Sequence, residues 1–283
     1  MYKTIVVHVD GAAGQDSRLR AAALLANDHG AHLIGMTATG ISWLDYAVLT
    51  GSFGAPVSLP ESDFQGLRDA AEERLAVFRR EAVRLGVESF EGHPNDDDAA
   101  YALLLESRYA DLVVLSQDQA GSGLPATLGR VAHLPEYVAL HGARPVLVVP
   151  SGYDNGVIPG TAVVGWDGGM QALRAISAAL PLLQRASTVQ LAVINPDQRS
   201  GLHGEQPGAD MALYLARHGV RVEVVRERTT STEGEALMAL ARDSGAGLMV
   251  TGAFGHSRYR EWVLGGVTRE LLERADIPLL IAH

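Results

Sequence analysis

Short runs rich in β-branched residues alternate along the chain with Ala/Leu-rich segments that have helical spacing. The first run begins at Thr4 and stops at the pair Asp10-Gly11. The same pattern predicts further strands and helices: strands over 32–36, 86–91, 110–115 and 144–149, and helices over 17–27 and 97–107. Near-continuously apolar strands that alternate with helices are typical of a parallel sheet covered on both faces.

The pattern then repeats. A second β-branched run starts at Thr161 and stops at Asp167-Gly168, 157 residues after the first Asp-Gly pair. Matching elements are predicted after it: strands over 188–194, 219–225, 246–251 and 277–282, and helices over 171–183 and 234–243. The second copy is shorter, mainly because the segment from 40 to 65 has no counterpart of similar length.

This repetition predicts an α/β protein made of two tandem, doubly wound, five-stranded parallel sheets. The predicted domains are residues 1–150 and 161–283, joined by a turn-rich linker at about 151–160. In such folds ligands bind at the carboxyl ends of the strands, near the point where the strand order reverses. We therefore expect functional residues directly after the first and fourth strands of each half.

Composition narrows the function. The 283 residues are 47% hydrophobic, contain no cysteine and carry a formal charge of −10. The absence of cysteine excludes thiolate chemistry, and the negative charge argues against a nucleic-acid partner. Lys3 is the single lysine, so a lysine-containing P-loop is excluded. The sequence has no apolar run long enough for a membrane span and no signal-peptide layout, so we expect a cytoplasmic protein without a membrane partner.

A glycine pattern follows the fourth strand of the second half. Gly252, Gly255, Gly265 and Gly266 are followed by Thr268, in the spacing G-x2-G-x9-G-G-x-T between a strand and a predicted helix. Glycines allow backbone N–H groups to approach an anion closely, and the start of a helix attracts phosphate. The spacing alone leaves two interpretations open, namely nucleotide binding and simple turn and capping chemistry.

With this motif the sequence resembles the universal stress protein family over both halves. The family's nucleotide-binding subgroup carries G-x2-G-x9-G-[ST], which matches here except at Gly266, where a serine or threonine is expected. The resemblance implies a Rossmann-like fold of the adenine nucleotide alpha hydrolase-like type, packed as a pseudo-dimer. It also implies ATP, which Mg²⁺ can accompany. Asp167 would face the nucleoside, the backbone at Val193 would read adenine, and the phosphates would lie on Gly265, Gly266, Val267 and Thr268.

The first half lacks the motif. Aligning the final strands and the fourth strands places Ser116 opposite Gly252, Gln119 opposite Gly255, and Pro135 opposite Thr268, with Ala132 opposite Gly265. Side chains at these positions crowd a close backbone approach, and proline has no N–H to offer. We therefore expect the first half not to bind ATP in the same manner, although Asp10 remains.

Three other features of the sequence are candidates for a functional role. The apolar content of 40–65 suggests a lid, a partner surface, a small-ligand pocket or simple packing on its own domain. The acidic run at 93–98 is interpreted as a helix start rather than a metal site. His256 and Arg258 could reach a phosphate or lie on a solvated loop.

The preferred hypothesis is a tandem universal stress protein that binds one ATP in its second half. It has no catalytic residue or metal site, a regulatory or stress-response role, and at most slow ATP hydrolysis. Its partners would be the nucleotide and an unidentified protein, and a homodimer is compatible with it. The alternative is a nucleotide-free interaction or small-ligand-binding protein. An adenylating enzyme ranks last, because neither Asp-Gly turn is followed by the S-G-G-x-D-S-type loop that it needs.

Overall fold

The computed structural model describes residues 1–42, 61–117, 133–154, 156–199, 205–254 and 266–283. Its first half has five strands: β1 (Thr4–His8), β2 (His32–Ala38), β3 (Phe90–Asn95), β4 (Leu112–Ser116) and β5 (Val146–Val149). The helices of this half are α1 (Gln15–His29), α3 (Glu61–Arg84), α4 (Ala99–Glu106), the short 3₁₀ helix η1 (Ser107–Tyr109) and α5 (Leu134–His141).

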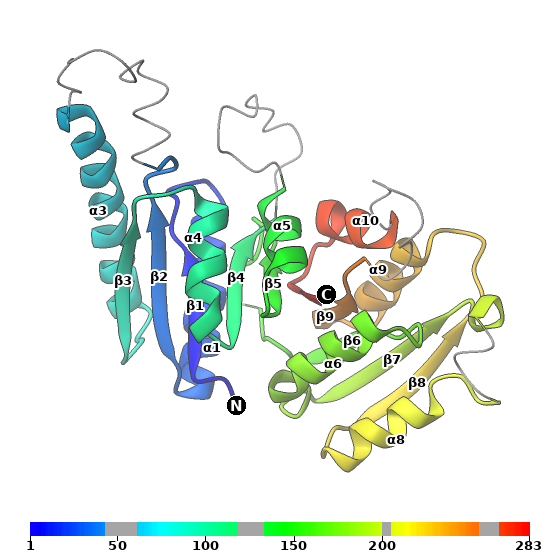
Figure 1. Ribbon diagram of the computed structural model, residues 1–283. Helices are drawn as coiled ribbons and strands as arrows, with labels where there is room; N and C mark the ends of the chain where they lie inside the picture. Colours follow the sequence, from blue (N-terminus) through cyan, green and yellow to red (C-terminus); the bar gives the residue numbers. More distant parts are fainter. Residues whose placement is uncertain (43–60, 118–132, 155, 200–204, 255–265) are drawn as a thin grey trace.

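The second half repeats this order (Figure 1). Its strands are β6 (Thr161–Gly165), β7 (Thr188–Ile194), β8 (Val222–Glu227), β9 (Ala246–Gly252) and β10 (Leu279–Ala282). Its helices are α6 (Met170–Leu183), the 3₁₀ helix η2 (Pro196–Arg199), α8 (Ala209–Arg217), α9 (Glu233–Asp243) and α10 (Gly266–Arg274). The predicted repetition of the α/β pattern is confirmed.

The strands form one ten-stranded sheet with the order β3-β2-β1-β4-β5-β10-β9-β6-β7-β8. Every neighbouring pair is parallel except β5 and β10, which pair antiparallel through Leu147 and Leu280. The two five-stranded sheets therefore join edge to edge, which gives the expected pseudo-dimer within one chain. In each half the first strand lies between the second and the fourth, so the strand order reverses there.

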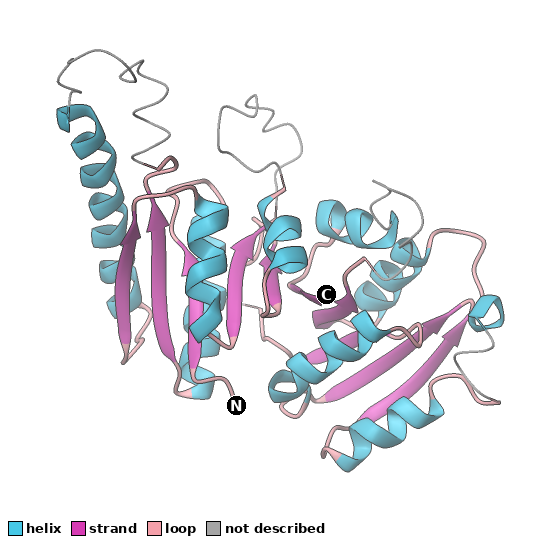
Figure 2. Ribbon diagram, in the orientation of Figure 1, coloured by secondary structure: helices cyan, strands magenta, loops and turns pink. Residues whose placement is uncertain are grey.

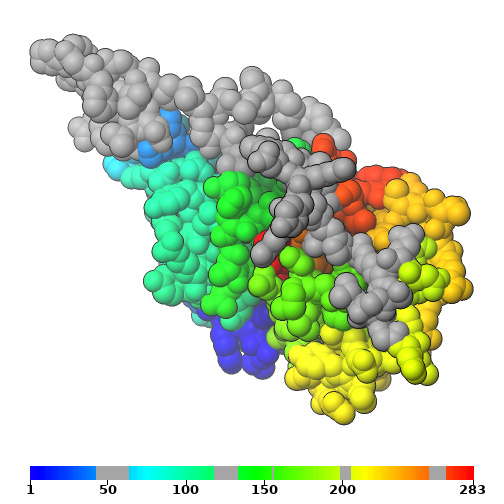
Figure 3. All heavy atoms as spheres, turned by 45° about the vertical axis from the view of Figure 1, so that its right-hand side comes forward, coloured from blue at the N-terminus to red at the C-terminus, as the bar shows by residue number. Residues whose placement is uncertain are grey.

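Helices cover both faces of the sheet (Figure 2). One face is buried against α1, α3, α6 and α8, and the other against α4, α5, α9 and α10. The central strands β1 and β4 are apolar on both faces, as a parallel sheet between two helical layers requires. In the space-filling view the two halves lie side by side as one body (Figure 3). Among the described residues, no helix is long and apolar enough to cross a membrane.

Helix ends follow local chemistry. Gly30 ends α1 in the left-handed conformation and donates its N–H to the carbonyls of Ala26 and Asn27. The Asp98 carboxylate accepts hydrogen bonds from the N–H groups of Ala100 and Tyr101 at the start of α4. The interpretation of the acidic run as a helix start is thus confirmed for Asp98. No group of three or more side chains placed to hold a metal occurs within the described ranges.

Two sequence predictions need correction. The third strand of the first half was expected over 86–91, but β3 spans Phe90–Asn95 because Gly86, at φ 73°, makes a turn and the chain enters the edge of the sheet later. Pro94 is tolerated there because an edge strand does not need every N–H. Helices α3 and α8 were not predicted, and residues 61–65 of the apolar 40–65 segment belong to α3. Residues 43–60 lie outside the described part.

Candidate functional site

In the second half, the predicted site residues that the structure describes lie along one edge of the sheet, the edge formed by the carboxyl ends of its parallel strands. Strand β6 lies between β7 and β9, so Asp167, Val193 and Gly252 all stand at or beyond the carboxyl ends of adjacent parallel strands. The side chain of Val193 is fully buried, which leaves its backbone as the part that a ligand could contact. Gly255, Gly265, His256 and Arg258 lie outside the described residues. The site prediction is therefore examined at Asp167, Val193, Gly252, Gly266, Val267 and Thr268.

Asp167 belongs to a tight Asp-Gly-Gly turn between β6 and α6. Its Oδ1 accepts a hydrogen bond of 2.8 Å from the N–H of Gly169, and Gly168 has a positive φ of 78° that favours glycine. This bond fixes the carboxylate above the end of the strand. The turn thus presents an acceptor at the edge where the fold places ligands.

Gly252 is required by packing. A Cβ at this position would lie 2.4 Å from the Ala172 backbone nitrogen and 2.6 Å from the Gln171 carbonyl carbon. The end of β9 therefore touches the first turn of α6 directly, with no room for a side chain. This close approach between strand and helix accounts for one motif glycine by packing.

The chain beyond Gly252 is tied to the start of α10. Phe254 has a positive φ of 59°, which is uncommon for a residue with a side chain, and its N–H donates to Thr268 Oγ1 at 3.2 Å. Thr268 is buried, so its hydroxyl anchors this part of the chain. At the start of α10, a Cβ on Gly266 would meet no atom of the described residues within 4 Å.

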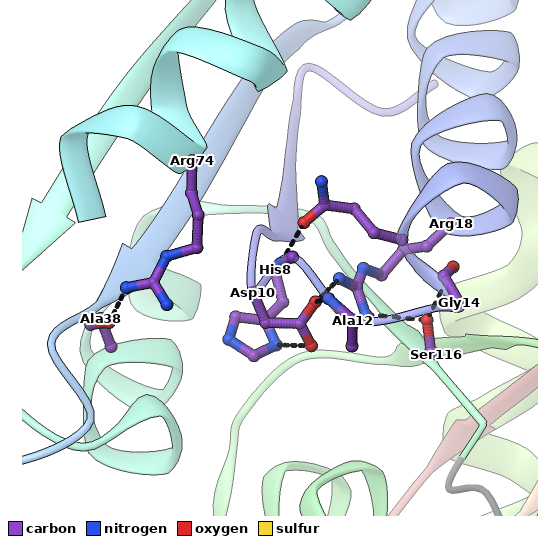
Figure 4. Close-up of polar contacts among 10 residues, drawn as sticks. His8, Asp10, Ala12, Gly14, Arg18, Ala38, Arg74 and Ser116 are labelled. Atoms are coloured by element: carbon purple, nitrogen blue, oxygen red, sulfur yellow. Dashed lines mark hydrogen bonds and ion pairs between the residues drawn. The ribbon is translucent and has the colours of Figure 1, made fainter. Parts of the chain in front are cut away.

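The corresponding edge of the first half is built from side chains (Figure 4). The Asp10 Oδ1 accepts hydrogen bonds from Arg18 Nη2 at 2.6 Å and from the Ala12 N–H at 2.9 Å. Arg18 also donates through Nη1 to Ser116 Oγ at 2.7 Å, and Ser116 donates to the Gly14 carbonyl at 3.1 Å. Arg18 is 1% exposed, so this ion pair is a buried feature of the first half.

The charge of Asp10 is held in place by these neighbours. Burial by itself raises the pKa of the carboxyl, but the charges of Arg18 and His8 and the hydrogen bonds from Arg18 and the Ala12 N–H outweigh it. The net result lowers the pKa of Asp10 from 3.8 to about 2. The carboxylate therefore stays ionised and bound to Arg18 at any physiological pH.

In both halves the end of the fourth strand contacts the start of the first helix, but the glycine of this contact lies on a different element in each half. In the second half the strand carries glycine, Gly252, and the helix carries Gln171; in the first half the strand carries Ser116 and the helix carries Gly14. A Cβ on Gly14 would lie 2.8 Å from Ser116 Oγ. The Ser116 hydroxyl lies against the start of α1 and donates to the Gly14 carbonyl.

The start of α5 differs from that of α10 in the expected direction. Pro135 stands in the first turn of α5, where the second half has Thr268, and it supplies no N–H. Gln119 and Ala132 lie outside the described residues. Sequence reasoning missed Arg18 altogether. The signal that could have found it is an arginine on the Ala/Leu-rich buried face of α1, next to Leu19 and in helical register with Ala22.

Comparison with known proteins follows the same division into two halves. A sequence model described as the universal stress protein family matches residues 1–150 and again residues 160–283. The chain belongs to the universal stress protein family. No curated protein sequence matches it significantly.

Solved structures of the family share the fold. A universal stress protein from Archaeoglobus fulgidus DSM 4304 is 16% identical, with a TM-score of 0.72 over 99% of this chain and 97% of that one. A putative universal stress protein from Pseudomonas aeruginosa UCBPP-PA14 is 13% identical, with a TM-score of 0.58 over 99% of this chain and 93% of that one. A universal stress protein in complex with cAMP is 23% identical and aligns with 52% of this chain and 97% of its own, with a TM-score of 0.39. At these identities the likeness shows the fold alone.

Proposed function

We propose that this universal stress protein binds one adenine nucleotide, ATP, in its second half and acts as a nucleotide-dependent regulator. The observation that carries the proposal is the placement of the Asp167 carboxylate, the Val193 backbone and the start of α10 around one edge of the sheet. This edge is where a doubly wound fold binds its ligands.

Each group has a defined task in this proposal. The carboxylate of Asp167 accepts hydrogen bonds from a ribose hydroxyl or an adenine amine, and the backbone of Val193 contacts the base. The N–H groups of Gly266 and Val267 and the positive end of the α10 dipole attract the phosphates. The missing hydroxyl at Gly266 removes one donor, and the Thr268 hydroxyl already accepts the Phe254 N–H. We therefore expect phosphate binding to depend mainly on backbone groups.

Calorimetric titration tests the proposal. ATP with Mg²⁺ should bind the full chain at one site, and AMP should bind more weakly because it offers fewer phosphate oxygens to the start of α10. Asp167→Asn keeps an oxygen for the Gly169 N–H but loses the charge and one strong acceptor, and it should weaken ATP binding by about tenfold, or about 1.4 kcal/mol.

The matched control is Ser116→Ala, which changes the corresponding edge of the first half and should leave the affinity for ATP unchanged. Failure of the intact protein to bind ATP would contradict the proposal and favour a nucleotide-free interaction protein. Equal affinities of the intact protein and Asp167→Asn would show that Asp167 does not contact the nucleoside. A loss of affinity in Ser116→Ala would move the nucleotide to the first half.

A further inference from the structure

A second arginine reaches the same edge of the first half from α3. The aliphatic part of Arg74 lies over the Asp10-Gly11 turn, since a Cβ on Gly11 would be 3.6 Å from Arg74 Cδ. Its Nη2 donates to the Ala38 carbonyl at 2.9 Å, at the end of β2. Figure 4 shows Arg74 and Arg18 on opposite sides of the segment that carries His8 and Asp10. Two cationic side chains therefore flank the point where the strand order reverses.

The described residues do not satisfy all the hydrogen-bonding groups at this edge. Buried atoms without a partner in the described part of the chain include Arg74 Nε, Arg18 Nε and Thr37 Oγ1, all from residues at or near the carboxyl ends of β1 and β2. A buried donor without an acceptor is destabilising. The guanidinium of Arg74 makes one hydrogen bond, to Ala38, and has no carboxylate partner among the described residues. An acceptor from outside the chain would complete it.

The charges at this edge do not cancel. Arg18 and Asp10 neutralise each other through their 2.6 Å ion pair, whereas the charge of Arg74 has no counterpart among the described residues. Arg74 therefore adds a positive charge beside the Asp10-Gly11 turn. A ligand with a single negative charge matches this arrangement better than a triphosphate does.

The backbone of the turn is already occupied. The N–H of Gly11 donates to Gln15 Oε1 at 2.6 Å, and the N–H of Ala12 donates to Asp10. In the second half the residue that corresponds to Gln15 is Ala172, which has no acceptor to offer Gly168. An anion at the first-half edge must therefore be recognised by side chains rather than by a glycine loop.

The second half has neither cation. The residue that corresponds to Arg18 is Ala175, and the one that corresponds to Arg74 is Pro207, just before α8 begins. Helix α3 is 24 residues long and α8 is 9, so the extra turns at the start of α3 are what bring Arg74 over the turn. The arginine pair is specific to the first half.

We propose that the first half binds a carboxylate-bearing small molecule at the carboxyl ends of β1 and β2, with Arg74 as the residue that recognises the carboxylate. Arg74 supplies a charged donor in a partly buried position, where a guanidinium–carboxylate hydrogen bond is stronger than at an open surface. Arg18 holds the Asp10 carboxylate through their 2.6 Å ion pair. The ATP site proposed for the second half is not required.

Nuclear magnetic resonance of the arginine Nε–Hε groups tests this directly. The full-length, ¹⁵N-labelled protein is titrated with acetate, with malate and with inorganic phosphate at constant ionic strength. The Arg74 resonance should shift saturably with a Kd of about 1 mM for at least one carboxylate. Arg74→Gln identifies that resonance and should abolish saturable binding. Arg80→Gln removes the same charge from an exposed position on the same helix and should leave binding intact.

Three results would overturn the proposal. Shifts that rise linearly and equally at Arg74 and Arg80 would show a salt effect only. Saturation that survives Arg74→Gln would place the anion elsewhere. Saturation by phosphate but by neither carboxylate would show that the site binds phosphate and not carboxylates. Asp167→Asn should leave the titration unchanged, so a failure of ATP to bind the second half is distinguishable from a failure of this site.

Discussion

The edges around Asp10 and Asp167 carry the same Asp-Gly turn on the same fold, yet their chemistry is opposite. Asp10 is bound to a buried arginine, and the N–H groups of its turn are taken by side chains. Asp167 has Ala175 in place of that arginine, and the neighbouring strand ends in a glycine. A duplicated site can therefore keep its Asp-Gly turn while the side chains around that turn differ between the two copies.

The largest expected effect comes from the tight contact in the second half. Gly252→Ser places a Cβ 2.4 Å from the Ala172 backbone nitrogen, and no side-chain change can relieve a clash with helix backbone. We expect a loss of about 3 kcal/mol in the free energy of unfolding, measured by urea denaturation. An unchanged stability would show that α6 can move away from β9 and that Gly252 is not a packing requirement.

Asp10→Asn should have the next largest effect. It leaves the buried Arg18 guanidinium without its anionic partner, and we expect a loss of about 2 kcal/mol in the free energy of unfolding. The matched variant Asp167→Asn should cost less, because asparagine can still accept the Gly169 N–H and position 175 carries alanine in place of the buried arginine. Equal losses in the two variants would contradict the asymmetry of the edges.

The same ion pair predicts a pH dependence. The pKa of Asp10 is lowered on folding, so its stabilisation is fully present above the unfolded-state value of 3.8 and is lost as the pH falls toward about 2. As the pH falls from about 5 to about 2, the intact protein should lose more unfolding free energy than Asp10→Asn, which has no carboxyl at position 10 to protonate. Parallel losses would show that other carboxyl groups dominate the acid response.

The smallest effect tests the exchange of glycine between strand and helix. Gly14→Ala places a Cβ 2.8 Å from Ser116 Oγ, a side-chain atom that can move, and should cost about 1 kcal/mol in unfolding free energy. Adding Ser116→Gly recreates the arrangement of the second half and should recover part of that loss. A double variant less stable than Gly14→Ala alone would show that loss of the Arg18–Ser116 bond outweighs the steric relief.

Much of the fold could be predicted because it is encoded locally. The alternation of apolar strands and amphipathic helices and the Asp-Gly turns identified the two halves and most of their elements. The predicted boundary of β3 was wrong. The chain turns at Gly86, and the strand ends in the polar sequence His93-Pro94-Asn95, which an apolar pattern does not identify as a strand. Helix α3 was missed because its polar face is wide and its first residues lie within the apolar 40–65 segment.

The candidate site was predicted less completely than the fold. The sequence singled out Asp167 and the motif glycines, and it recognised that Ser116 and Pro135 alter the first half. It did not connect Arg18 with Asp10 or Arg74 with Gly11, because these contacts join residues from different elements. Whether ATP binds at the second half stays a prediction for the titration described above.

The sequence by itself determined the two tandem α/β halves and their asymmetric pair of strand-end turns, because periodicity and turn chemistry act over a few residues. Only the tertiary structure decided how the copies meet and what fills each edge. The antiparallel pairing of β5 with β10, the burial of Arg18 and the reach of Arg74 depend on elements that are distant in sequence and adjacent in space. Such contacts are selected by packing and charge balance within the folded chain, which no local pattern records.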